Sequence, residues 1–257
     1  MKKVFERPQS LSENCFHYCP GCGHGVAHRL VAEVIDELGI MERTVGICPV
    51  GCAVYAYDYF ECDMIEASHG RAPAVATGAK RVLPGHIVFT YQGDGDLAAI
   101  GIGEMIHAAA RGENFTTIFI NNGVYGMTQG QMAPTTPIGQ KTTTSPSGRS
   151  ISQEGNPIKV CELLNAIDGP AYLARVAITS PKTIARARRC IRKAFEVQLA
   201  GQGFSLVEVL TSCPTYWHLS PAEALAYIEE NVIPAFPLGE FRVPAGTAAP
   251  VAAHAPA

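Results

Sequence analysis

Apolar and polar residues alternate along this chain with two different periods. Helical spacing, with apolar residues three or four positions apart, runs through "HGVAHRLVAEVIDELG", "APAVATGAKRVL", "DLAAIGIGEMIHAAARG", "IKVCELLNAI" and "PKTIARARRCIRKAFEVQLAG". Short apolar runs typical of buried strands occur at "TVGIC", "HIVFTYQ", "TTIFIN", "AYLARVAI" and "FSLVEVL". Strands that alternate with helices predict an α/β fold, a mainly parallel sheet with helices on both faces.

Two segments depart from this alternation. Residues 123–157 are rich in Thr, Gly, Pro, Gln and Ser, and a segment of that length between regular elements is usually functional or disordered. The end of the chain, residues 244–257, consists mostly of Ala and Pro and is expected to be disordered. We therefore expect one domain over residues 1–243, with a long active-site loop at about 123–157.

Composition narrows the class of protein. The chain has 257 residues, of which 47% are hydrophobic and 17% charged, and its formal net charge is -3. This balance gives no reason to expect nucleic acid or an anionic membrane as a partner, and the basic helix at 181–201 is expected to be solvated surface. No apolar run reaches transmembrane length, and "MKKVFERPQS" is not a signal peptide, so we expect a cytoplasmic protein.

Polar side chains follow two of the predicted strands at the point where each ends. "GDGD" follows "HIVFTYQ", and "NNG" follows "TTIFIN", so Asp94 and Asn122 are 28 positions apart. The strand–helix–strand connection should bring both strand ends to one edge of the sheet. Carboxylate and amide oxygens suit Mg²⁺, which usually also binds phosphate oxygens, while glycines and a helix N-terminus let main-chain N–H groups approach a diphosphate. A tight turn with an Asp N-cap is the alternative, but the second polar strand end argues against it.

"GDG" followed by "NN" at this spacing resembles the motif of thiamine-diphosphate enzymes. The resemblance implies that Mg²⁺ is held by the side chains of Asp94 and Asn122 and by the main-chain carbonyl of Val124. It also implies a pyrophosphate-binding domain of the α/β class.

Nine cysteines require a second explanation. Cys161 and Cys190 fall inside helical patterns and are expected to be core residues. "YCPGCGHG" is a C-x-x-C motif, "GICPVGC" adds two cysteines and "LTSCPTYW" one more. Zinc, a redox dithiol and an iron–sulfur cluster are all compatible with a C-x-x-C motif alone.

Together these motifs resemble the β subunit of 2-oxoacid:ferredoxin oxidoreductases of the 2-oxoglutarate and branched-chain types, from about Cys19 to Phe241. The matching segments are "CPGCGHG", "GC" with "HGRA", "GDGDLAAIG", "NNGVYGMT", "GQMAPTT" and "CPTYW". The resemblance implies one 4Fe–4S cluster held by Cys19, Cys22, Cys52 and Cys213. Cys52 is preferred over Cys48 because it lies 17 positions before His69 of "HGR", as the family pattern requires. Cys48, Cys15 and Cys62 fall outside the pattern.

The resemblance also implies which residues contact the cofactor and the substrate. His69 should bind a phosphate oxygen, and Thr128 and Gln129 should face the substrate. Family members place Lys or Gly at the position of Gln129, so this chain departs from both patterns and its 2-oxoacid is left open. The residues implied in cofactor binding are His24, His69, Gly70, Arg71, Gly93, Asp94, Gly95, Asp96, Asn122, Tyr125, Gly126, Met127 and Thr128.

The reaction implied is oxidative decarboxylation of a 2-oxoacid to acyl-CoA and CO₂, with electrons passed through the 4Fe–4S cluster to ferredoxin. The glutamate that activates thiamine in this family is expected in a separate α subunit, and the resemblance also allows small γ and ferredoxin-like δ subunits as partners. Two other hypotheses remain. A non-redox thiamine-diphosphate decarboxylase β half would not need the cysteines, and a zinc-binding module would not need Asp94 with Asn122.

Overall fold

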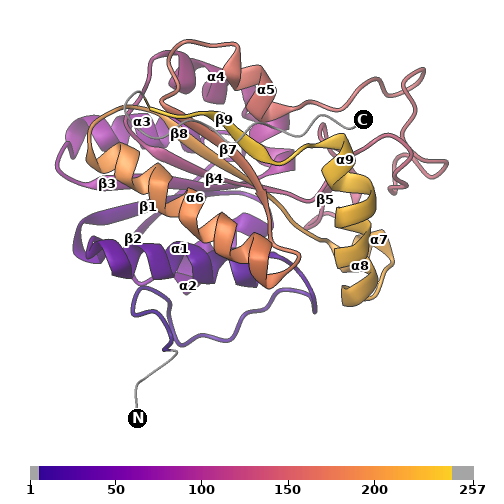
Figure 1. Ribbon diagram of the computed structural model, residues 1–257, viewed down its shortest axis with the longest axis horizontal. Helices are drawn as coiled ribbons and strands as arrows, with labels where there is room; N and C mark the ends of the chain where they lie inside the picture. Colours follow the sequence, from indigo (N-terminus) through magenta and orange to yellow (C-terminus); the bar gives the residue numbers. More distant parts are fainter. Residues whose placement is uncertain (1–5, 245–257) are drawn as a thin grey trace.

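One seven-stranded sheet runs through residues 6–244, the part of the chain that the computed structural model describes (Figure 1). The strand order is β2-β1-β3-β4-β8-β7-β9, and every neighbouring pair is parallel except β7 with β9. The predicted mainly parallel α/β sheet is confirmed. The strands of this sheet are β1 (Thr44–Pro49), β2 (Asp63–Ala67), β3 (Ile87–Gly93), β4 (Thr116–Asn121), β7 (Tyr172–Ala177), β8 (Ser205–Leu210) and β9 (Gly239–Arg242).

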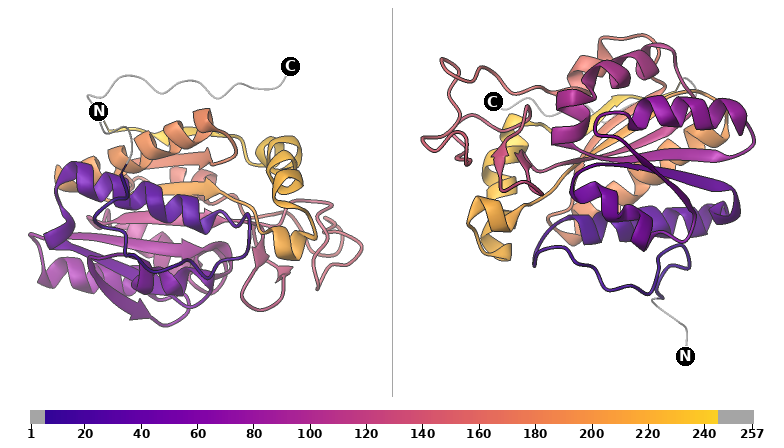
Figure 2. Two further views of the ribbon diagram at one scale, coloured as in Figure 1. Left: turned by 90° about the horizontal axis from the view of Figure 1, so that it is seen from below. Right: turned by 180° about the vertical axis from the view of Figure 1, so that it is seen from behind.

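Helices cover both faces of the sheet (Figure 2). One face is packed by α1 (His24–Leu38) and α6 (Pro181–Leu199), which also contact each other. The other face is packed by α3 (Ala72–Val82), α4 (Ile102–Ala110) and α5 (Val160–Asn165). The predicted core positions of Cys161 and Cys190 are confirmed, since both are buried against the sheet.

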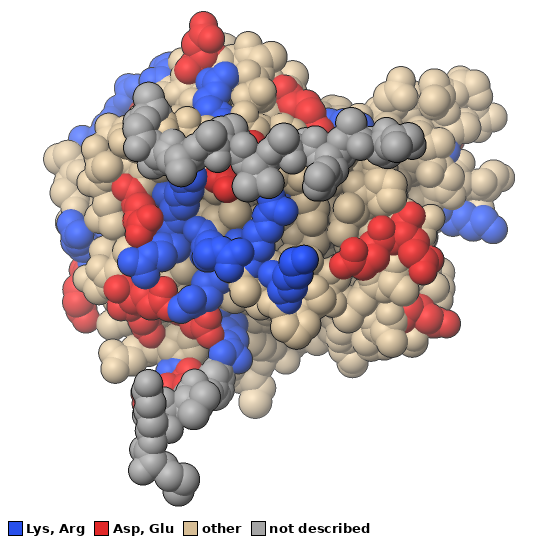
Figure 3. All heavy atoms as spheres, in the orientation of Figure 1, with Lys and Arg blue, Asp and Glu red and all other residues tan. Residues whose placement is uncertain are grey.

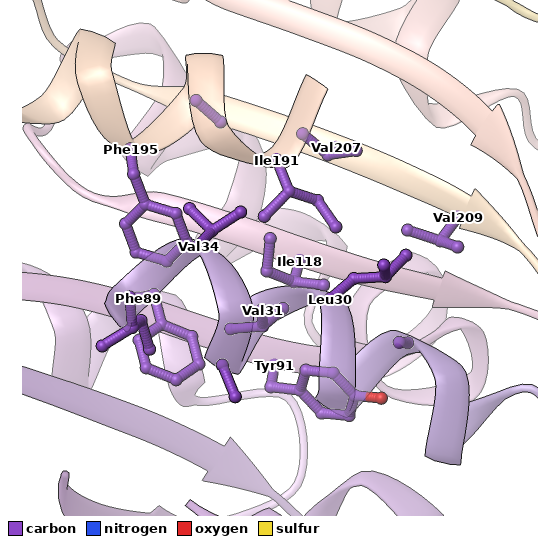
Figure 4. Close-up of a cluster of buried hydrophobic side chains, with 14 of the residues drawn as sticks. Leu30, Val31, Val34, Phe89, Tyr91, Ile118, Ile191, Phe195, Val207 and Val209 are labelled. Atoms are coloured by element: carbon purple, nitrogen blue, oxygen red, sulfur yellow. The ribbon is translucent and has the colours of Figure 1, made fainter. Parts of the chain in front are cut away.

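The two cores follow from the two-residue period of the strands. On β3, Phe89 and Tyr91 point toward α1 and α6, whereas Val88 points to the opposite core. Figure 4 shows Leu30 of α1 and Phe195 of α6 among the side chains packed on the first face. Because both faces are covered, β1, β4, β7 and β8 are buried along their whole length.

Several elements were not predicted from the sequence. β2 lies at one edge of the sheet with most side chains exposed, and β9 is a short antiparallel strand at the other edge. Neither has the continuous apolar run of a central strand. The predicted helix over residues 96–112 is divided: Gly95–Ile100 forms a π-helix, and the α-helix begins only at Ile102. The predicted long loop contains a two-stranded hairpin of β5 (Val124–Tyr125) and β6 (Gln131–Met132).

A small helical layer and the loop 123–157 lie beyond the carboxyl ends of the parallel strands, at the right of Figure 1. Ile228, Val232 and Phe236 attach this layer to the ends of β7 and β8. The short elements not yet placed are η1 (Met41–Arg43), η2 (Cys52–Tyr55), α2 (Ala56–Tyr59), α7 (Pro214–Trp217), α8 (Pro221–Tyr227), η4 (Ile228–Val232) and α9 (Ile233–Ala235).

The basic face of α6 lies on the front of the molecule in Figure 3. Arg188 and Arg192 form ion pairs with Glu37 of α1, while Lys182 and Arg189 are exposed, as expected for a solvated helix face. Among residues 6–244, no helix is long and apolar enough to cross a membrane. The Ala/Pro-rich tail predicted to be disordered lies outside the described residues from 245 onward.

Candidate functional site

The carboxyl ends of β3 and β4 are neighbours, as Gly93 pairs with Ile120 in the parallel register. Asp94 and Asn122 follow these two ends and come together as the sequence predicted. One Asp94 oxygen, Oδ2, accepts hydrogen bonds from the main-chain N–H of Asn122 (3.3 Å) and of Gly123 (2.6 Å). The other, Oδ1, accepts from the N–H of Gly95 (2.8 Å).

Asp94 is a buried carboxyl group surrounded by donors. Thr135, from the long loop, adds a hydroxyl donor 2.9 Å from Oδ2. Burial raises the pKa of Asp94 to about 6, while the hydrogen bonds from Thr135 and from the main chain of Gly123 act in the opposite direction. A carboxylate held in this way, beside the Asn122 amide, is a hard-oxygen site suited to Mg²⁺.

A cavity of about 360 Å³ opens beside this turn. At Gly51 and Gly93, which line it, an added Cβ would meet no protein atom within 4 Å, so bare backbone borders open space there. At Gly95 a Cβ would approach the Tyr125 ring to 2.4 Å, so only glycine fits. These features fit a diphosphate that approaches main-chain N–H groups. The cavity is lined by His24, Val50, Gly51, Cys52, Ala53, His69, Gly93, Asp94, Gly95, Asp96, Asn122, Val124, Tyr125, Gly126, Met127 and Thr128.

Asp96 joins the "HGR" turn to the π-helix. Its Oδ1 accepts from the N–H of Gly70 (2.5 Å) and lies 3.0 Å from Nδ1 of His69. Its Oδ2 accepts from Nε2 of Gln92 (2.6 Å), a fully buried residue at the end of β3 that sequence reasoning missed. The pKa of Asp96 is raised by burial, against these hydrogen bonds. Asp96 therefore fixes the ring of His69 at the cavity wall.

Not every predicted residue reaches the cavity. The guanidinium of Arg71 is paired with Glu104 of α4 and lies outside the cavity lining. Gln129 is exposed beside Thr128 and has a φ of 83°, a conformation that favours glycine. Its role at the substrate, like that of Arg71 at the diphosphate, stays a prediction.

Two of the predicted cysteine ligands lie beside Gly126, which lines the cavity. A Cβ at Gly126 would lie 3.4 Å from Sγ of Cys52 and 3.6 Å from Sγ of Cys213. Burial first, and then the nearby thiols of Cys22, Cys52 and Cys19, raise the pKa of Cys213 to about 12, and the same thiols act on Cys22 and Cys52. All four thiols are therefore within electrostatic reach of one another.

Cys48 has different surroundings. Burial raises its pKa to about 11, and the charge that raises this pKa as well is that of Glu66, not a cysteine of the set. Its thiol donates to the carbonyl of Ile65 (3.8 Å). Cys15 is exposed, and Cys62 is buried with its thiol 3.9 Å from the sulfur of Met64. Cys48 and Cys62 thus behave as core thiols.

The four thiols supply soft donors, the type that iron–sulfur clusters use. Within residues 6–244, no three His, Cys, Asp or Glu side chains have the geometry of a metal-ion site. Burial first, and then the neighbouring thiols, raises the pKa values of Cys22 and Cys52 to about 11, so these thiols are protonated at neutral pH. Metal binding here would have to release their protons.

Arg149 holds the long loop together, and no sequence pattern pointed to it. Its buried guanidinium donates to main-chain carbonyls of the loop. Nη1 bonds to Pro134 and Thr136 (both 2.9 Å), Nε to Gly155 (2.9 Å) and Nη2 to Asn156 (2.8 Å). Because Thr135 lies between two of these anchor points, Arg149 also determines where the Asp94 hydrogen bond can form.

Arg149→Met should release this loop, because the substitution leaves several buried carbonyls without a donor, at about 3 kcal/mol or more. We expect faster limited proteolysis within residues 123–157 and weaker binding of a magnesium–diphosphate ligand at the Asp94 turn. Arg189→Met, an exposed arginine on α6, is the matched control. Equal proteolysis of the two variants would contradict the role given to Arg149.

The fold and this turn define a known class. Residues 49–209 match the family described as "Thiamine pyrophosphate enzyme, C-terminal TPP binding domain". The chain belongs to this family, and within it to the 2-oxoacid:ferredoxin oxidoreductase subunits. The resemblance seen in the sequence is confirmed.

Three relatives support this placement. The chain is 50% identical to ketoisovalerate oxidoreductase subunit VorA of Methanothermobacter thermautotrophicus, over 93% of this chain and 50% of that protein. It is 38% identical to 2-oxoglutarate synthase subunit KorB of Methanocaldococcus jannaschii, over 84% of this chain and 78% of that one. The structure resembles 2-oxoglutarate:ferredoxin oxidoreductase from Magnetococcus marinus, solved with 2-oxoglutarate, coenzyme A and succinyl-CoA bound. The TM-score is 0.73 at 32% identity, over 84% of this chain and 70% of that chain. The chain spans only about half the length of its VorA relatives.

Proposed function

We propose that this chain is the thiamine diphosphate-binding subunit of an enzyme that oxidatively decarboxylates a 2-oxoacid, forms acyl-CoA and passes electrons to ferredoxin. The observation that carries the proposal is the position of Gly126. Gly126 lines the cavity beside Asp94, and a Cβ added to it would lie 3.4 Å from Sγ of Cys52 and 3.6 Å from Sγ of Cys213. An organic cofactor site and a thiol site are thus direct neighbours, as electron transfer between them requires.

The cofactor would be bound by groups already in place. The side chains of Asp94 and Asn122 and the carbonyl of Val124 would hold Mg²⁺, and the N–H groups near Gly95 would meet the diphosphate. When bound, thiamine diphosphate supplies the electron sink needed for decarboxylation. The chain's own contribution is to orient the diphosphate and to exclude water with Val50, Ala53 and Met127.

A 4Fe–4S cluster would be held by Cys19, Cys22, Cys52 and Cys213. Cys52 supports this most directly, because it lines the cavity and its sulfur, like that of Cys213, lies beside Gly126. A closed zinc site would give no reason for the thiols to adjoin a cofactor cavity. The thiol site therefore favours a redox enzyme over a non-redox decarboxylase.

Further subunits are part of the proposal. The cavity is open, and Val50 and Met127 on its lining are 42% and 40% exposed, which leaves apolar surface for another chain to cover. An α subunit would supply the activating glutamate, with small γ and ferredoxin-like δ subunits as additional partners. Ferredoxin and coenzyme A would be the other reactants.

An apolar, branched 2-oxoacid fits this cavity best. Among the described residues, neither Lys nor Arg lines it, so nothing in this chain meets a second carboxylate there. Gln129, next to the cavity, is neutral. The higher identity to the ketoisovalerate oxidoreductase subunits than to the 2-oxoglutarate synthase subunits points the same way.

The direct test is ferredoxin reduction by the assembled enzyme with coenzyme A and a panel of 2-oxoacids, with Gln129→Lys beside the wild type. A lysine would place an ammonium near the substrate tail. We expect the kcat/KM ratio of 2-oxoglutarate to ketoisovalerate to rise by about tenfold or more, equivalent to about 1.4 kcal/mol. Gln129→Met, similar in length and uncharged, is the control.

Three outcomes separate the possibilities. Decarboxylation without ferredoxin reduction, in protein that lacks iron, would replace the proposal by the non-redox thiamine enzyme. Activity of the isolated chain would disprove the need for an α subunit. An unchanged preference in Gln129→Lys would show that this position does not face the substrate tail.

A further inference from the structure

A row of polar side chains, partly exposed at its outer end and buried at its inner end, crosses the sheet and ends at the turn beside Asp94. Glu162 of α5 accepts from Arg175 of β7, with Nη1 to Oε1 at 2.9 Å. Nε of Arg175 donates to Oε2 of Glu208 on β8 at 2.8 Å. The other oxygen of Glu208 accepts from Nδ2 of Asn121, at the end of β4, at 2.7 Å. Arg175 and Glu208 are fully buried.

Stability alone does not explain this row. A buried ion pair loses much of its hydration, and apolar residues of similar volume are often as stabilising. Arg175 is already enclosed by the Phe236 and Phe241 rings, 5.3 Å and 5.0 Å from its guanidinium carbon, in a setting where an apolar side chain would also fit. The row therefore calls for a role at its inner end.

That inner end controls the orientation of one amide. Because Glu208 faces the Arg175 guanidinium, it is a carboxylate that only accepts hydrogen bonds. The Asn121 amide must then turn its NH₂ group toward Glu208, which leaves Oδ1 to accept the N–H of Gly123 at 3.2 Å. With the amide reversed, two donors would face each other at Gly123.

Gly123 is the residue at which the turn is set. Its N–H also bonds to Asp94 at 2.6 Å, and its φ is 70°. The residues on either side of it, Asn122 and Val124, are the proposed Mg²⁺ ligands. An amide that fixes the Gly123 N–H therefore fixes the direction of the Asn122 side chain and of the Val124 carbonyl.

We propose that Glu208 is a positioning residue for the magnesium–diphosphate turn, which it orients by fixing the amide of Asn121. This inference rests on the proposed function only in taking Mg²⁺ with thiamine diphosphate as the ligand. Glu208 itself does not line the cavity. Its effect reaches the ligand through Asn121 and Gly123.

An exchange of the two groups tests the idea. Glu208→Gln makes the amide orientation ambiguous, and Asn121→Asp sets two carboxylates against each other. The double variant restores every hydrogen bond and reverses only the one between positions 121 and 208. The new carboxylate at position 121 accepts from the N–H of Gly123 and from the NH₂ of the new amide at position 208, whose oxygen accepts from Arg175. We expect each single variant to bind Mg²⁺ with thiamine diphosphate about tenfold or more weakly, and the double variant to bind within about threefold of wild type.

Binding is measured by titration calorimetry on the full chain in the assembled enzyme, with thermal unfolding of every variant. Glu162→Gln is the matched control, because it breaks the outer contact of Arg175 and leaves Asn121 untouched. It should lower the unfolding temperature but leave the dissociation constant within about twofold.

Two results would overturn the inference. One is a loss of affinity in the double variant equal to the sum of the losses in the two single variants. The other is a loss of affinity in Glu162→Gln as large as that in Glu208→Gln, which would show that the row acts only through stability. If the single variants unfold, the double variant and Glu162→Gln still decide between these results. A wild-type enzyme that does not bind thiamine diphosphate would overturn the proposed function first.

Discussion

Asp94→Ala is expected to abolish binding of Mg²⁺ with thiamine diphosphate while the iron content stays unchanged. The substitution removes the carboxylate that accepts hydrogen bonds from the main chain of Asn122 and Gly123, whereas the proposed cluster ligands are the thiols of other residues. Bound thiamine diphosphate is measured by mass spectrometry of the purified enzyme, and iron by chemical analysis. Asp63→Ala, on the exposed edge strand β2, is the matched control.

The same carboxyl group predicts a pH dependence. The folded-state pKa of Asp94, raised to about 6, lies above the value in an unfolded chain. Protonation of Asp94 therefore stabilises the folded, cofactor-free protein, and this stabilisation is lost as the pH rises through about 6. Mg²⁺ requires the carboxylate, so its affinity should fall by about tenfold between pH 7 and pH 5. Asp94→Ala should remove this part of the pH dependence of unfolding. For the binding experiment, full occupancy of thiamine diphosphate in purified Asp94→Ala would contradict the assignment of Asp94 as a Mg²⁺ ligand.

The central strands and the meeting of Asp94 with Asn122 could be predicted because each depends on short-range patterns. β4 is buried from end to end, and its sequence "TTIFIN" combines β-branched residues with the apolar run at 118–120. Once β3 and β4 are adjacent, the direction of parallel strands brings their carboxyl ends together without knowledge of any side-chain contact. β2 and β9 were missed because exposed edge strands lack this run.

The supporting residues of the site could not be predicted. Arg149 bonds to main-chain carbonyls, which every residue has, so no sequence pattern identifies its partners. Thr135 reaches Asp94 across 41 positions and Glu208 reaches Asn121 across 87. Such contacts depend on how the loop and the strands pack. For Arg71 the sequence motif suggested the diphosphate but not the ion pair that its side chain forms with Glu104, so its role at the diphosphate stays a prediction.

Cys52→Ser and Cys48→Ser, four positions apart, should have opposite effects. Cys52→Ser removes a thiolate from the site shared with Cys213 and is expected to lose most of the iron or to make the cluster labile to oxygen. Cys213→Ser should behave in the same way. Because these two cysteines lie on distant parts of the chain, loss of either should also lower the unfolding temperature of the iron-loaded protein.

Cys48→Ser should retain its iron, because the Cys48 thiol is buried beside Ile65 and apart from the other four. A serine hydroxyl can still donate to the Ile65 carbonyl, so the loss of stability should be about 1 kcal/mol. Iron analysis and electron paramagnetic resonance of the reduced enzyme compare the two variants, with ferredoxin reduction as the functional measure. If the iron and the resonance signal vanish in Cys48→Ser and persist in Cys52→Ser, then Cys48 is the ligand, and the contact of Cys52 with Gly126 is packing alone.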